Sequence, residues 1–193
     1  MNLETGVRLP PHPSSFISAE TPAFRRGEEV QGDVFDLAQA CGGVAIIGTN
    51  TVTNHAGLAV MGRGAAKQAT SRYPELPAQF GSWLSRFPIS IREQRGTVHR
   101  QAIAVRQYTF LTPERYRILA FMVKYGWWEN ADILIIDQQA SILQDCCQRH
   151  PDVMFFLTRV GCGNGHLAWR DVRAVLANRI TVPNLRLVAP NDA

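Results

Sequence analysis

The sequence predicts an α/β domain, because two segments each have the order buried strand, glycine-rich loop, helix. In the first, the mostly apolar run 43–50 precedes a loop with three glycines and the helix-forming residues 65–69. In the second, residues 153–157 precede a loop at 161–165, and apolar residues then recur at helical spacing from Trp169 to Ile180. Short apolar runs of this kind form strands buried on both faces. Such strands belong to an open sheet, whose strand ends bind ligands.

The other elements follow from periodicity and from turn residues. Residues 131–150 could open as a strand at Ile133, but their length and helical spacing favour a helix. The pattern further predicts a strand end at 29–31 that turns through Gly32 into a short helix. It also predicts a helix over 78–87 after Pro74 and Pro77 end the preceding one, strands around 98–104 and at 117–123 joined through Thr112-Pro113, and a closing strand at 185–188.

The chain divides into a leader and one domain. Residues 1–23 contain four prolines and several serines without sustained periodicity, which is typical of a flexible, proline-rich leader. Residues 24–193 are dense in apolar residues and form the domain. The whole chain of 193 residues is 46% apolar, enough for a sizeable core.

Charge and cysteine content limit the classes of function. The net charge of +4 suits a phosphorylated ligand or weak nucleic-acid contact, although a mildly basic surface needs neither. The four cysteines form no C-x-x-C pair, so we expect no zinc site. Without a signal peptide or a long apolar stretch, the chain is expected in a reducing cytoplasm, away from the membrane.

The two glycine loops are candidate anion sites. Backbone N–H groups of such loops and the positive end of a following helix dipole converge on one point. An ordinary tight connection without a ligand is the alternative. Neither loop matches a P-loop or a dinucleotide fingerprint, which argues against ATP hydrolysis and hydride transfer. A pyrophosphate held between two loops remains, with no cofactor and no metal.

Three motifs and the strand that ends at Asn50 together resemble a macrodomain. The motifs are Gln31-Gly32-Asp33-Val34, Met61-Gly62-Arg63-Gly64-Ala65-Ala66, and Gly161-Cys162-Gly163-Asn164-Gly165-His166-Leu167-Ala168-Trp169. The resemblance covers about residues 28–190. It is greatest to the branch with ADP-ribosyl-DNA and ADP-ribosyl-glutamate hydrolases and ADP-ribose-1''-phosphate phosphatase-like proteins. It implies a three-layer α/β/α fold with a mixed central sheet. It also implies ADP-ribose or an ADP-ribosylated substrate as the partner.

The resemblance assigns roles to residues. Asp33 would accept a hydrogen bond from the adenine amine, whereas its position alone suggests a helix N-cap. Asn50 would face the distal ribose. Residues 121–124 resemble a Phe-Pro-Thr-Lys run of the same branch. The expected ligand-binding residues are Asp33, Val34, Asn50, Met61, Gly62, Arg63, Gly64, Gly161, Cys162, Gly163, Asn164, Gly165 and His166.

Departures from that branch bear on catalysis. Its hydrolases have a lysine where this chain has Thr70, and some members have a carboxylate where it has Gly165 or His166. A mechanism that uses both groups is therefore not expected, and Asn50 and His166 remain as candidate catalytic residues. His166 could equally donate one hydrogen bond or face solvent.

Three function classes stay open. The first is a hydrolase acting on ADP-ribose derivatives, either a phosphatase or an ADP-ribosyl hydrolase. The second is a non-catalytic receptor for ADP-ribose or a related nucleotide signal. The third is a weak nucleic-acid binder.

Overall fold

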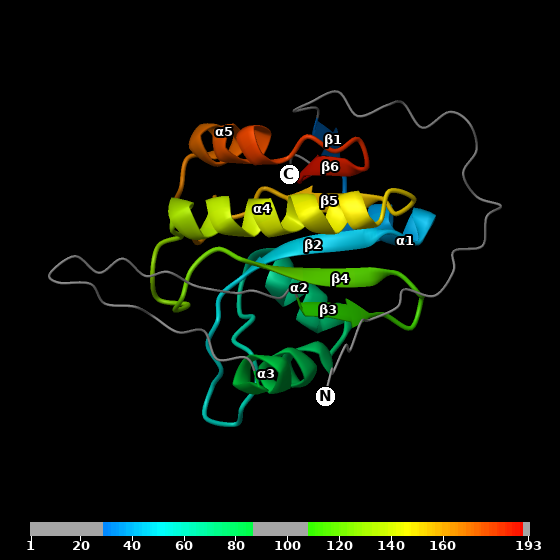
Figure 1. Ribbon diagram of the computed structural model, residues 1–193. Helices are drawn as coiled ribbons and strands as arrows, with labels where there is room; N and C mark the ends of the chain where they lie inside the picture. The colour runs from blue at the N-terminus through cyan, green and yellow to red at the C-terminus, as the bar shows by residue number, and fades with distance from the viewer. Residues whose placement is uncertain (1–28, 87–107, 191–193) are drawn as a thin grey trace, which may run out of the picture.

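A six-stranded mixed sheet in the order β1-β6-β5-β2-β4-β3 forms the middle layer of the molecule. The structure, a computed structural model, describes residues 29–86 and 108–190 (Figure 1). Five strands run parallel, and β3 pairs antiparallel with β4 at one edge. The strands are β1 (Glu29–Gln31), β2 (Val44–Thr49), β3 (Tyr108–Leu111), β4 (Arg117–Met122), β5 (Phe155–Thr158) and β6 (Leu185–Ala189). The mixed α/β architecture expected from the sequence is confirmed.

Helices cover both faces of the sheet, which makes the three layers. They are α1 (Val34–Cys41), α2 (Gly64–Arg72), α3 (Leu76–Arg86), α4 (Ile133–Arg149) and α5 (Trp169–Arg179). The first three pack with Ala45 and Ile47 of β2 in one core, and α4 and α5 pack with Val44 and Ile46 in the other. Alternate residues of β2 thus enter opposite cores, which explains its unbroken apolar run.

The predicted elements match with small shifts at their ends. Residues 131–150 are helical, because α4 spans Ile133–Arg149 and Asp132 caps it by accepting a hydrogen bond from Leu134 N at 2.8 Å. Pro77 does not end a helix. It is the second residue of α3, which begins two residues earlier than predicted, and the first turn of a helix tolerates proline because its N–H groups have no intrahelical acceptor.

One strand was missed. β3 lies at Tyr108–Leu111, inside what the sequence predicts as a connection, and is a short edge strand with alternating burial. Thr112-Pro113 belongs to the tight turn that joins it to β4, where Thr112 N donates to Tyr116 O at 3.0 Å. The strand expected around 98–104, the leader at 1–23 and the first residues of the predicted domain lie outside the described residues.

Candidate functional site

A crevice of about 970 Å³ lies where the parallel strands end. Strand order places Gly32 and Asp33, which follow β1, at one end of it. Lys124, Trp127 and Trp128, which follow β4, lie at the other end. Between them run the β2–α2 loop, which we call the first loop (residues 50–63), and the β5–α5 loop, the second loop (residues 159–168). The volume suits a ligand of cofactor size.

Every residue expected to bind a ligand lines this crevice. They are Asp33, Val34, Asn50, Met61, Gly62, Arg63, Gly64, Gly161, Cys162, Gly163, Asn164, Gly165 and His166. They belong to segments that follow β1, β2 and β5. The first and the last of them are more than 120 residues apart in sequence, and the order of the strands in the sheet brings them together. Their contact with a ligand stays a prediction.

Asp33 has a structural role beside the predicted one. Its Oδ1 accepts hydrogen bonds from Phe35 N at 2.8 Å and Asp36 N at 3.2 Å, so it caps α1. Its Oδ2 pairs with Arg72 at 3.0 Å. The N-cap expectation is therefore confirmed, and the carboxylate is fixed at the β1 end of the crevice.

The second loop presents a row of unused donors. In the described part of the chain, the N–H groups of residues 162–165 have no hydrogen-bond acceptor. The next two N–H groups close the turn, since His166 N donates to Gly163 O at 3.0 Å and Leu167 N to Gly161 O at 3.1 Å. The positive φ angles belong to Gly161 at 77° and His166 at 58°, rather than to Gly163. Successive free N–H groups in such a turn form an anion-binding concavity.

The first loop presents donors from the opposite wall. Helix α2 begins there with Arg63 as N-cap, whose side chain makes no capping hydrogen bond. The N–H groups of residues 64–66 accordingly lack acceptors within the described structure, as the first turn of an uncapped helix does. These residues line the crevice, so the positive end of the helix dipole faces it.

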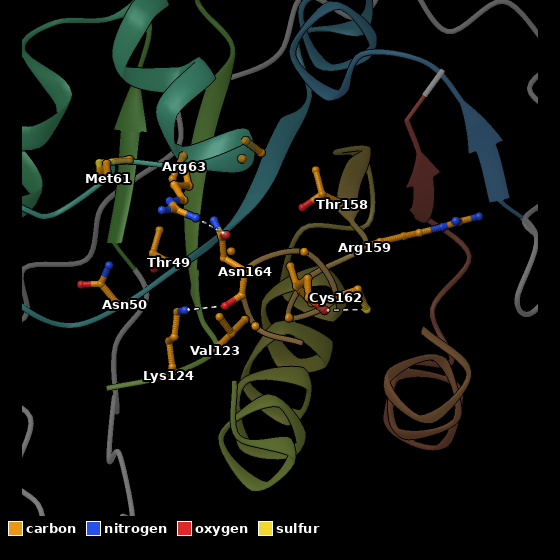
Figure 2. A pocket seen from close by; sticks show the side chains of 18 of the residues that line it. Thr49, Asn50, Met61, Arg63, Val123, Lys124, Thr158, Arg159, Cys162 and Asn164 are labelled. Atoms are coloured by element: carbon orange, nitrogen blue, oxygen red, sulfur yellow. Dashed lines mark hydrogen bonds between the residues drawn. The ribbon is translucent and has the colours of Figure 1, made fainter. Parts of the chain in front are cut away.

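Asn50, which the sequence predicts as a site residue, is bonded within its own loop, whereas its neighbour Thr49, which was not predicted, offers a hydroxyl without a partner in the described part of the chain. The Asn50 amide is used inside the loop: its Nδ2 donates to Val60 O at 2.7 Å and its Oδ1 accepts from Val52 N at 3.1 Å. Thr49 was not predicted as a site residue, yet its buried hydroxyl lines the crevice and lacks a partner among the described residues. Both side chains are visible in Figure 2.

Lys124 is the second residue that the sequence did not assign to the site. It is only 8% exposed, and its Nζ donates to the carbonyl oxygens of Glu129 at 2.9 Å, Asn164 at 3.0 Å and Trp127 at 3.4 Å. Burial lowers the pKa of Lys124, and the nearby Arg63 charge lowers it further. Its place in the Phe-Met-Val-Lys run was the one available signal.

The crevice lining does not include Thr70, the position where the resemblance expects a lysine in hydrolases. Thr70 lies on α2, where its hydroxyl donates a hydrogen bond to Ala66 O at 3.1 Å, away from the crevice lining. Burial raises the pKa of Cys162, which favours the thiol over a nucleophilic thiolate. His166 is exposed at the crevice.

The described residues contain no group of three or more His, Cys, Asp or Glu side chains placed to hold a metal ion. None of their helices combines the length and the apolar character that crossing a membrane requires.

The three-layer α/β/α architecture, with a crevice of ligand size between two glycine loops, is the fold of a macrodomain. Among solved structures, the macrodomain of Mycobacterium tuberculosis DarG has a TM-score of 0.60 and 22% identity, over 86% of this chain and 100% of that one. The macrodomain of Thermus aquaticus DarG has a TM-score of 0.61 and 19% identity, over 85% of this chain and 96% of that one. Thermosipho africanus DarTG in complex with ADP-ribose has a TM-score of 0.60 and 16% identity, over 82% of this chain and 40% of that one. No family model and no curated protein matches the sequence.

Proposed function

We propose that the crevice binds ADP-ribose or an ADP-ribose derivative. The observation that supports this best is that two rows of N–H groups in the crevice lining, residues 64–66 in α2 and 162–165 in the second loop, have no acceptor in the described structure. A diphosphate between the loops would supply acceptors to both rows, and helix N-termini favour anions. A protein of the same fold, Thermosipho africanus DarTG, has been solved in complex with ADP-ribose.

In this proposal the ligand lies along the crevice with its adenine at the β1 end and its distal ribose at the β4 end. Asp33 accepts the adenine amine at the β1 end, the two loops hold the diphosphate, and the distal ribose lies toward Asn50 and Lys124. The Asn50 side chain is already bonded to its own loop, so it shapes the wall rather than reacting. Thr49 adds a hydroxyl on this side.

We favour a receptor over a hydrolase. The position of the hydrolase lysine holds Thr70, outside the crevice lining. A carboxylate cannot stand at Gly165 without a shift of the loop, because a Cβ there would lie against Gly161 O and 2.6 Å from the Ala131 Cβ. None of the cations that line the crevice takes the place of that lysine in this proposal, because Arg63 and Arg159 carry guanidinium groups and the Lys124 ammonium already donates to three carbonyl oxygens.

Calorimetry with ADP-ribose, ADP and AMP tests the proposal. We expect saturable heat with ADP-ribose, weaker binding of ADP, which lacks the distal ribose, and little binding of AMP. A nucleic-acid binder would give no ADP-ribose heat, and its affinity for single-stranded DNA would fall steeply as salt rises. Equal affinity for ADP-ribose and AMP would contradict the arrangement along the crevice.

Hydrolysis is the second candidate, and the position of His166 in the loop that offers the N–H row favours it. If the protein is an ADP-ribose-1''-phosphate phosphatase or an ADP-ribosyl hydrolase, His166→Gly should lower kcat about a hundredfold or more. Glycine keeps the left-handed backbone at this position, so the loop is preserved. Lack of turnover by the wild-type protein on both substrate types would leave the receptor. The four free cysteines support a reducing cytoplasm as its location.

A further inference from the structure

A hydrogen bond crosses the crevice from one loop to the other. Arg63, at the end of the first loop, donates from Nη1 to Asn164 Oδ1 in the second loop at 3.1 Å, although 101 residues separate the two in sequence. Both residues line the crevice, and their side chains point toward one another over it (Figure 2). We call this contact the bridge.

Lys124 holds the far end of the bridge in place. Its ammonium binds the Asn164 carbonyl at 3.0 Å while the Arg63 guanidinium binds the Asn164 side chain, so one residue is held at both its backbone and its amide. The other two acceptors of Lys124, the carbonyls of Glu129 and Trp127, belong to the β4–α4 connection. Lys124 therefore ties the second loop to the end of β4.

The two bonds differ in strength because they differ in burial. Lys124 is buried, so its charge-assisted bonds act where water does not compete. Arg63 and Asn164 are exposed, and a single bond to a neutral acceptor at such a site shifts an equilibrium only about two- to tenfold. The bridge should consequently open often, while the Lys124 anchor stays closed.

We propose that the Arg63–Asn164 bridge is a gate on ligand exchange. Lys124 is the positioning residue that holds Asn164 where the Arg63 side chain can reach it. This inference rests on the proposed binding of ADP-ribose. The bridge joins the two loops between which the diphosphate is proposed to lie, so in this inference its closed fraction slows association as well as release. Because the bridge is made by side chains alone, it opens without any change in the strands that hold the loops.

Stopped-flow association of ADP-ribose with Arg63→Ala tests the gate. We expect the association rate constant to rise about two- to tenfold, the factor by which one exposed hydrogen bond holds the gate closed. The sign is the discriminating feature. If Arg63 only attracted or contacted the ligand diphosphate, removal of its positive charge would lower the association rate or leave it unchanged. Arg170→Ala is the matched control, since it removes an exposed arginine outside the crevice lining that pairs with its neighbour Asp171.

Two further variants test the partners of the bridge. Asn164→Ala should raise the association rate by the same factor as Arg63→Ala, and the double variant should add nothing, because either change removes the same bond. In a Lys124→Met background, Arg63→Ala should no longer change the rate, since Asn164 is then not held in place. A merely structural Lys124 would lower stability but leave the effect of Arg63→Ala intact.

The outcomes separate this inference from the proposed function. Absence of ADP-ribose heat with the wild-type protein overturns the proposed function and the gate with it. Normal binding by the wild-type protein with an unchanged or slower association for Arg63→Ala overturns the gate alone. Additive effects of Arg63→Ala and Asn164→Ala do so as well.

Discussion

At the scale of single residues, Asp33 shows how one side chain can hold structure and site together. One carboxylate oxygen caps α1 and the other pairs with Arg72, at the end of the crevice where we propose that adenine lies. A cap and an acceptor make different demands, because asparagine can replace aspartate in the first role but offers an N–H group in place of the second oxygen.

We expect Asp33→Asn to keep the fold and to weaken ADP-ribose binding about tenfold, whereas Asp33→Ala should weaken binding and also lower the free energy of unfolding by about 1 kcal/mol. Calorimetry measures the first effect and urea unfolding the second. Asp36→Ala is the control, since it removes the other Arg72 partner and lies outside the crevice lining. Wild-type affinity in Asp33→Asn would make Asp33 a cap alone.

At the scale of elements, two glycines of the second loop, Gly163 and Gly165, differ in what surrounds them. A Cβ on Gly165 would meet Gly161 O and the Ala131 Cβ, and Gly165 O accepts the hydrogen bond of Ala131 N at 2.9 Å. A Cβ on Gly163, which lines the crevice, would meet nothing within 4 Å. Gly165 is therefore needed for folding, whereas Gly163 leaves space for a ligand.

These positions make a matched pair of variants. Gly163→Val should unfold at the wild-type urea midpoint and lose ADP-ribose binding, since the side chain fills the space between the loops. Gly165→Ala should lower the free energy of unfolding by about 1–3 kcal/mol, the usual cost of overpacking. Urea unfolding and calorimetry on both proteins decide. Full affinity in a folded Gly163→Val protein would contradict the placement of the diphosphate.

Helix α4 makes stability depend on pH through its C-cap, His150. Burial lowers the pKa of His150, and the charges of Arg149 and Arg117 lower it further. In the unfolded chain the imidazole titrates near its ordinary value of about 6.5, so below that pH the unfolded state binds more protons than the folded one. Stability therefore falls as pH drops below about 6.5, until the folded state is protonated as well.

His150→Gln should make the free energy of unfolding less dependent on pH between about 5 and 7. Urea unfolding at several pH values measures this slope, and His55→Gln, in an exposed loop, is the control. An unchanged slope in His150→Gln would show that other groups cause the dependence.

At the scale of the whole molecule, the sequence predicted the parts that local patterns determine. The helical spacing of α5 and the apolar run of β2 predicted these two elements directly, and the length of residues 131–150 favoured a helix over a strand at Ile133. The structure confirms all three elements. The glycines marked two loops but left both a ligand site and an ordinary connection open. β3 was missed because four residues on a sheet edge carry too short an alternation to stand out from a loop.

The interactions inside the crevice could not be predicted, because they join segments that only the sheet order brings together. Lys124 and Asn164 are 40 residues apart and meet because β4 and β5 both flank β2. The unpartnered hydroxyl of Thr49 likewise depends on what its neighbours leave unfilled. Composition and spacing contain no information about either.

The two tryptophans beside Lys124 make the crevice optically observable. Trp127 and Trp128 are 59% and 61% exposed, their ring centroids lie 5.7 Å apart at 88°, and both line the crevice, whereas Trp83 and Trp169 are half-buried elsewhere. Indole emission reports the polarity around the ring, so a ligand that fills this end should shift and change the intrinsic fluorescence. We expect titration with ADP-ribose to give a saturable spectral change that Trp127→Phe/Trp128→Phe abolishes. A change that survives in that double variant would come from the half-buried rings and would mean that the ligand acts on the packing of the molecule instead. The unmodified protein thus carries its own chromophore for measuring occupancy, without a label on any residue of either loop.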